Sequence, residues 1–102
     1  MPRESIMAIR DAFNFDSLVN EAERMVLDEL ETQLGAVKDA CTCQDCVLDM
    51  AAWALNNVKP AYRVSLMGSV YAREAGKERK VHDIRHAVRA AIQKIKANPS
   101  HD

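Results

Sequence analysis

Residues that break helices are scarce in this sequence, which has only 3 glycines and 3 prolines among 102 residues. Such a low content argues against a long disordered or low-complexity region and indicates a mostly helical protein. Long apolar runs are also missing, which argues against a membrane-spanning helix. The first residues, MPRESIMAIRDAF, lack the continuous apolar core of a signal peptide. We therefore expect a cytoplasmic protein with no membrane partner.

The chain is long enough for one domain with an ordinary core and too short for two. Residues 17–98 carry the periodic apolar patterns and form the expected domain. Residues 1–16 are predicted to form an N-terminal arm or a short helix, in which the apolar positions are Ile6, Ile9 and Phe13.

Two helices are expected in the first half of the domain, because apolar residues recur there at steps of three and four. Asp16 or Ser17 can cap the first helix, and Gly35 ends it. The second helix begins at Asp45 or the residue after it and continues to Asn57, shortly before a proline that forbids further helix.

Two short strands and a last helix complete the predicted fold. The segment AYRVSL alternates apolar and polar residues, and MGS followed by VYAR indicates a hairpin turn into a second strand. Residues 77–97 then form a helical seam that can pack within the domain or against a second copy. The predicted class is α+β, a mostly helical small domain with a short β-hairpin.

Charge is distributed unevenly along the chain, although the net charge is only −1. Residues 1–49 hold 4 basic residues against 11 acidic ones, whereas residues 73–96 hold 8 against 3. This asymmetry favours head-to-tail packing, dimerisation or an anionic ligand at the basic end, and it also fits two solvated helix faces. A sequence pI near 6.3 and an acidic first helix argue against binding to a nucleic acid polymer.

All three cysteines, Cys41, Cys43 and Cys46, lie in the run ACTCQDCVLD. In a reducing compartment, such crowded thiols favour a metal site over a structural disulfide, and zinc prefers four tetrahedral ligands. The candidates for the fourth ligand are His82, His86, Asp45, Asp49, a second chain and water. We select His82 for the predicted zinc site. The alternatives are three partly buried thiols without metal, or a redox pair, for which the neighbouring βαβ pattern is absent.

Catalytic motifs are missing from the sequence. It contains neither a glycine-rich phosphate loop nor a serine nucleophile elbow. A nucleophilic Cys46 with His82 or His86 is not singled out by any spacing. We therefore expect a protein that is not an enzyme.

The run CTCQDCVLDMAAWALNNVKPAYRV resembles the signature of the late competence development protein ComFB family. In that signature a Cys-x-Cys-x-x-Cys-x-x-Asp loop and helix precedes Ala-x-x-Leu-Asn, Pro-x-Tyr and a strand. The matching residues are Cys41, Cys43, Cys46, Asp49, Ala52, Leu55, Asn56, Pro60 and Tyr62, with Asn20, Glu21, Val26 and Glu29 upstream. The chain departs from the family pattern in having no cysteine after Cys46 and a single proline before the tyrosine.

The resemblance implies a homodimer, with zinc in members that carry a fourth cysteine near the C-terminus. It also implies a receptor for cyclic di-AMP or cyclic di-GMP, as members in some bacteria are. Each subunit of a two-fold dimer can offer an arginine to a phosphate and an aromatic face to a base. The candidate ligand-binding residues are Asn56, Pro60, Tyr62, Arg63, Arg73, Lys77, Arg79, Arg85 and Arg89.

Each candidate residue also has an ordinary structural interpretation. The basic residues can be solvated surface groups, the tyrosine can pack across a strand, and the asparagine can cap its helix. The alternative function is a dimeric adaptor without a small ligand, of the competence or type IV pilus kind, with a structural zinc or thiol cluster. Both functions require a downstream protein partner that the sequence does not identify.

Overall fold

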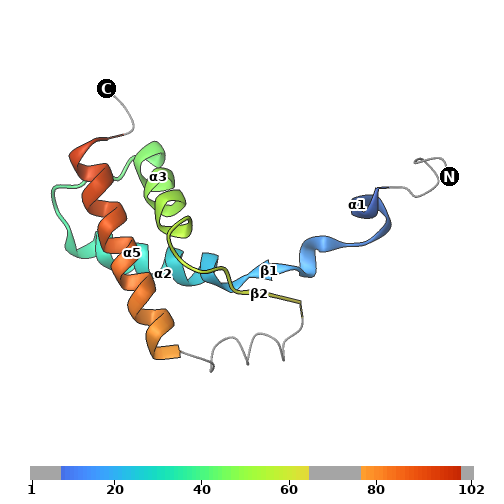
Figure 1. The fold of residues 1–102 in the computed structure, drawn as a ribbon. Helices are drawn as coiled ribbons and strands as arrows, with labels where there is room; N and C mark the ends of the chain where they lie inside the picture. Colours follow the sequence, from blue (N-terminus) through green and yellow to red (C-terminus); the bar gives the residue numbers. More distant parts are fainter. Residues whose placement is uncertain (1–7, 65–76, 100–102) are drawn as a thin grey trace.

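The computed structural model describes residues 8–64 and 77–99, and the mostly helical α+β class expected from the sequence is confirmed there (Figure 1). Its elements in chain order are α1 (Ile9–Ala12), the 3-10 helix η2 (Phe15–Ser17), β1 (Val19–Asn20), α2 (Glu21–Ala36), α3 (Gln44–Leu55), β2 (Tyr62–Arg63) and α5 (Lys77–Ala97). No helix in these described ranges is long and apolar enough to cross a membrane.

The three long helices α2, α3 and α5 pack against one another and enclose the core. The core residues are Val26 and Leu30 from α2, Cys46, Met50, Ala51 and Ala54 from α3, and Ile84, Ala87, Val88, Ala91 and Ile92 from α5. They follow the helical spacing seen in the sequence, because one stripe of each amphipathic helix must be removed from water. The bounds of α5 agree with the sequence prediction, and those of α3 differ from it by one or two residues.

The start of α2 differs from the prediction. The expected cap at Asp16 or Ser17 is wrong, since both residues belong to η2 and the helix begins at Glu21. The cap is Asn20, whose Oδ1 accepts a hydrogen bond from the backbone N–H of Ala22 at 3.1 Å. The apolar residues just before it are in extended backbone rather than helix, so their helical spacing was coincidental.

β2 confirms the strand predicted at Tyr62, and β1 is its antiparallel partner within the described residues. Asn20 pairs with Tyr62 in this short sheet. The strand expected in VYAR lies outside the described residues. Two further hydrogen bonds join Ala61, the residue before β2, to the start of α2. Ala61 N donates to Asn20 Oδ1 at 2.7 Å, and Glu21 N donates to Ala61 O at 2.8 Å. The start of α2 therefore determines where the segment after α3 runs.

The segment from α1 to η2 reaches away from the three long helices (Figure 1). Its apolar side chains are largely in water, with Ile9 59%, Phe13 65% and Phe15 45% exposed, and Leu18 just after it is 46% exposed. The Cα radius of gyration is 17.3 Å, whereas a compact domain of this length has a radius of about 13 Å. The described chain thus has an apolar N-terminal arm that its own core does not cover.

Candidate functional site

The three cysteines meet at the start of α3. Their Sγ atoms all lie within 4.8 Å of one another, and none is in a disulfide. Cys43 is the residue before the helix, Cys46 is buried in its first turn, and Cys41 lies half-buried in the preceding loop. All three thiols therefore lie together at the N-terminal end of α3.

The donor set fits a soft metal ion. Zinc binds thiolates at about 2.3 Å in a tetrahedron, which places two sulfurs about 3.8 Å apart. The three Sγ atoms lie within 4.8 Å of one another, so modest side-chain rotations would allow all three sulfurs to bind one ion. The three cysteines can therefore hold a metal ion, and thiolate donors favour zinc over hard cations such as magnesium.

The structure does not bring His82 to these sulfurs. His82 lies with Asn57 and Lys59, beyond the C-terminal end of α3, whereas the thiols lie at its N-terminal end. A helix of 12 residues separates the two places by about 18 Å. In residues 8–64 and 77–99, no histidine or carboxylate joins the three sulfurs as a fourth member of the group. The expected pairing of His82 with the cysteines thus has no support in this geometry.

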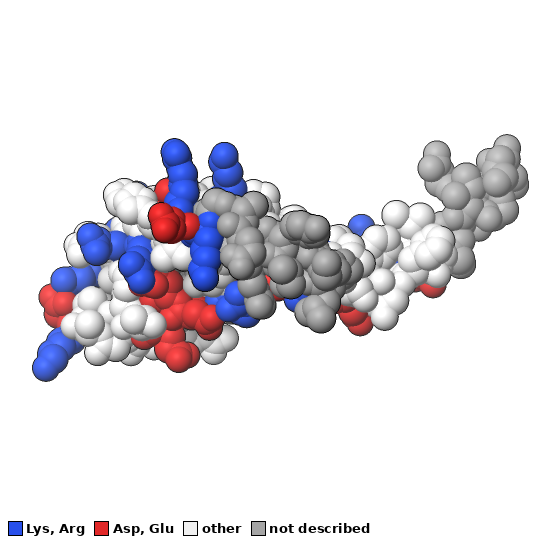
Figure 2. Space-filling view, turned by 90° about the horizontal axis from the view of Figure 1, so that it is seen from below, with Lys and Arg blue, Asp and Glu red and all other residues white. Residues whose placement is uncertain are grey.

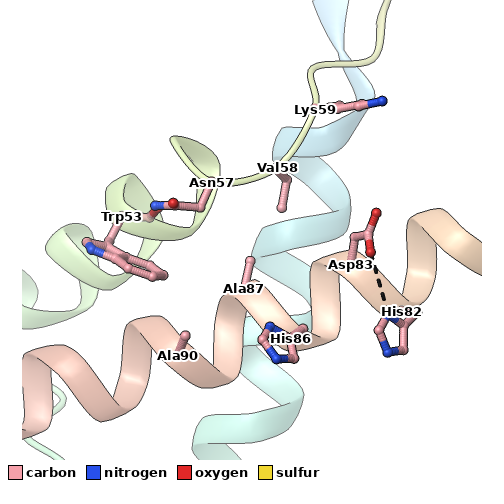
Figure 3. A pocket seen from close by; sticks show the side chains of 9 residues that line it. All are labelled: Trp53, Asn57, Val58, Lys59, His82, Asp83, His86, Ala87 and Ala90. Carbon is pink, nitrogen blue, oxygen red and sulfur yellow. Dashed lines mark hydrogen bonds and ion pairs between the residues drawn. The ribbon is translucent and has the colours of Figure 1, made fainter.

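A hollow of about 540 Å³ lies between the end of α3 and the middle of α5 (Figure 3). Its lining residues are Trp53, Asn57, Val58, Lys59, His82, Asp83, His86, Ala87 and Ala90. The small side chains of the two alanines on α5 leave the hollow open, and the larger polar and aromatic side chains surround it. Its volume is in the usual range for small-molecule sites. Sequence reasoning missed most of these residues, although Trp53 and Lys59 lie inside the quoted signature.

Arg63 is engaged by a carboxylate. Its Nε donates to Oε1 of Glu21 at 2.9 Å, and its Nη2 lies 2.9 Å from the same oxygen. Arg24 holds the other oxygen, with Nη2 3.2 Å from Oε2. The hydrogen bond from Arg63 lowers the pKa of Glu21 although burial opposes it, and Arg24 lowers it further. A phosphate must therefore compete with Glu21 for Arg63.

The other predicted ligand-binding residues are spread over several places. Tyr62 is 63% exposed on β2, and Asn56 and Pro60 are exposed between α3 and β2. Arg79 is exposed near the start of α5, whereas Arg85 and Arg89 line a smaller hollow of about 290 Å³ beside α2. Lys77 is also exposed, and Arg73 lies outside the described residues. The structure does not gather these residues into one site.

The acidic and basic parts of the chain are brought together by the fold. α2 packs along α5, where Arg85 Nε lies 3.8 Å from Glu29 Oε1. Lys96 Nζ lies 2.8 Å from Asp39 Oδ2 near the other end of α5, and this hydrogen bond lowers the pKa of Asp39. Figure 2 shows Lys and Arg beside Asp and Glu over this face. Part of the charge asymmetry is thus neutralised within one domain.

Comparison with known proteins gives two findings. The model of a family described as late competence development protein ComFB matches residues 19–99. The chain is also similar to a solved structure titled "Structural characterization of the late competence protein ComFB from Bacillus subtilis", with 26% identity and a TM-score of 0.67. That match covers 81% of this chain and 92% of the other. No curated protein matches the chain.

Proposed function

The chain belongs to the ComFB family of late competence development proteins, and on that premise we propose that it is a regulatory homodimer that binds a cyclic dinucleotide. The proposal joins the family resemblance to the shape and chemistry of the hollow between α3 and α5. Binding rather than catalysis is the proposed role, and the bound state would be passed to a protein partner.

The observation that carries the proposal is the combination of groups around the hollow. Trp53 offers an indole ring, which can stack on a nucleobase. Lys59 is exposed at the same hollow and can meet a phosphate oxygen. Asn57 donates through Nδ2 to the backbone oxygen of Trp53 at 2.7 Å, which leaves its amide oxygen to accept from a base edge.

The symmetry of the ligand fits a dimer of this chain. A cyclic dinucleotide has two bases and two phosphates, so a two-fold dimer can offer one hollow to each half. The exposed apolar side chains of the N-terminal arm support a contact with a second copy, because contiguous exposed apolar side chains are typical of interaction sites. Tyr62 and Arg79 are exposed and remain candidates for further ligand contacts.

The experiment is a titration of the full chain with cyclic di-AMP and with cyclic di-GMP. Trp53 is the only tryptophan in the sequence, so its fluorescence reports on the hollow without labelling. We expect a saturable emission change and a calorimetric stoichiometry of about one dinucleotide per two chains. If both ligands at tens of micromolar produce no heat of binding and no thermal shift, the receptor proposal is wrong.

Lys59→Ala and Lys38→Ala form a matched pair of variants. Both lysines are exposed, but only Lys59 lies at the hollow. Loss of one charge-assisted contact should weaken binding about tenfold in Lys59→Ala and leave Lys38→Ala like the parent. Equal affinities in both variants would place the ligand elsewhere on the chain. Arg63→Ala is unsuitable for this purpose, because it also disturbs the buried Glu21.

A ligand-free dimeric adaptor is the second candidate function, and the exposed arm is the observation that favours it. This candidate predicts a dimer by light scattering with no response to either dinucleotide. In both cases we propose zinc for the thiol cluster, where it would link the loop before α3 to the helix start. Elemental analysis of protein purified without a chelating tag tests this, and Cys43→Ser should lower the zinc content.

A further inference from the structure

His82 and His86 lie one turn apart on α5, at the edge of the hollow (Figure 3). Side chains four residues apart on a helix are neighbours, with Cβ atoms about 5–6 Å from each other. The two imidazole rings are nearly parallel, at 24°, and their centroids lie 6.2 Å apart. Both side chains are exposed, so rotation about their side-chain bonds can turn a nitrogen of each ring toward one point.

A nearby carboxylate can orient the first of these rings. Asp83 Oδ1 lies 3.5 Å from His82 Nδ1. A carboxylate on one ring nitrogen holds that nitrogen protonated and presents the other as a lone pair, which is the usual arrangement behind a metal-bound histidine. The pair thus combines two nitrogen donors from one helix face with a partner that selects the tautomer.

We propose that His82 and His86 form a second metal site, a two-nitrogen chelate for a divalent transition metal such as Ni²⁺, Cu²⁺ or Zn²⁺. Imidazole nitrogens bind these ions in preference to Mg²⁺ and Ca²⁺, which take oxygen ligands. Metal–nitrogen bonds of about 2.0–2.1 Å require the two donor nitrogens to approach to about 3 Å, within reach of rings on adjacent turns. Two protein ligands leave positions open for water or an anion in the hollow.

The histidine site is separate from the thiol cluster. The cysteines lie before and in the first turn of α3, whereas the hollow lies at the end of that helix. Each site therefore loads without the other, and a chain with both filled carries two ions. The total metal content of the protein then does not report on the cysteines alone.

The experiment uses the full chain loaded with one equivalent of Zn²⁺, so that the thiol cluster is already occupied, here and in the NMR measurement below. The loaded chain is titrated calorimetrically with NiCl₂ in a buffer that does not bind metals. We expect His82→Gln and His86→Gln each to weaken Ni²⁺ binding about 100-fold, because the second donor of a chelate acts at high effective concentration. The double variant should be little weaker than either single one, since one remaining imidazole cannot chelate. His101→Gln, which changes the remaining histidine of the chain, should bind like the parent.

Proton NMR gives a readout that does not depend on affinity alone. Substoichiometric Ni²⁺, which is paramagnetic, should broaden the ring signals of His82 and His86 before those of His101. Cys43→Ser should leave this pattern unchanged and so separates the site from the thiol cluster. The proposal is overturned if the single histidine variants bind Ni²⁺ like the parent, if the cysteine variant abolishes the broadening, or if equimolar Mg²⁺ displaces the Ni²⁺.

Discussion

Arg63→Ala is the substitution that tests most directly how the structure uses this arginine. In the parent protein, Glu21 is only 3% exposed, and its Oε1 atom lies 2.9 Å from both the Nε and the Nη2 atoms of Arg63. Removal of the guanidinium leaves that oxygen of a buried carboxylate without either contact. Arg24 still donates hydrogen bonds to the other oxygen, so the buried negative charge keeps one of its two arginine partners.

The expected cost follows from these contacts. Hydrogen bonds to a charged group contribute about 1.5–3 kcal/mol, and complete loss of the partner of a buried charge costs about 3–5 kcal/mol. Because Arg24 remains and Arg63 is itself 25% exposed, we expect the lower range, about 2 kcal/mol. For a domain of this size, that corresponds to a fall in Tm of about 8–16 °C.

The assay is urea and thermal unfolding followed by far-UV circular dichroism at pH 7. Arg79→Ala is the matched control, since it removes an exposed arginine and should change the free energy of unfolding by less than about 0.5 kcal/mol. The Glu21→Gln, Arg63→Ala double variant then measures the coupling between the two side chains. If Arg63→Ala is as stable as Arg79→Ala, the ion pair contributes nothing and Arg63 is available to a ligand.

Three further predictions concern the same fold. Arg63 lowers the pKa of Glu21 below its ordinary 4.5, so this stabilisation is present above pH 4.5 and lost as the pH falls through the folded-state pKa. Urea midpoints of the parent and Glu21→Gln should therefore converge on acidification, and a constant difference would contradict the linkage. Asn20→Ala removes the acceptor of two backbone N–H groups and should lower the free energy of unfolding by about 1–3 kcal/mol, which urea unfolding measures. Met50→Ala empties a fully buried position and should cost about 2–5 kcal/mol in the same assay. Leu48→Ala on the exposed side of α3 is its control, and equal losses would contradict the assigned core face.

Local patterns in the sequence predicted a helix well where its apolar residues recur regularly along its whole length. α5 agrees with its predicted bounds because its apolar residues recur over many turns and little else competes. The closeness of the cysteines was also predictable, since six consecutive positions cannot separate far. The motif quoted from Cys41 to Val64 resembled the family signature, and the match over residues 19–99 shows the family.

The start of α2 shows why boundaries were less predictable. Leu18 and Val19 continue the helical spacing of the residues after them, but Leu18 follows η2 in extended backbone and Val19 pairs with Arg63 in a strand. Asn20 then caps the helix and also binds Ala61, far along the chain. A cap shared with a distant segment leaves no local signal, because its second partner is known only after folding.

Composition and spacing thus indicated a mostly helical domain and a thiol cluster, and the resemblance of the cysteine motif to a known signature pointed to the family. All of these depend on residues close together in the chain. Tertiary structure decided which distant groups meet. It joined Glu21 to Arg63, placed His82 at the hollow beyond the end of α3 rather than beside the cysteines, and left space beside Ala87. The physical reason is that a helix fixes distances along itself, whereas packing between helices fixes the distances between their ends.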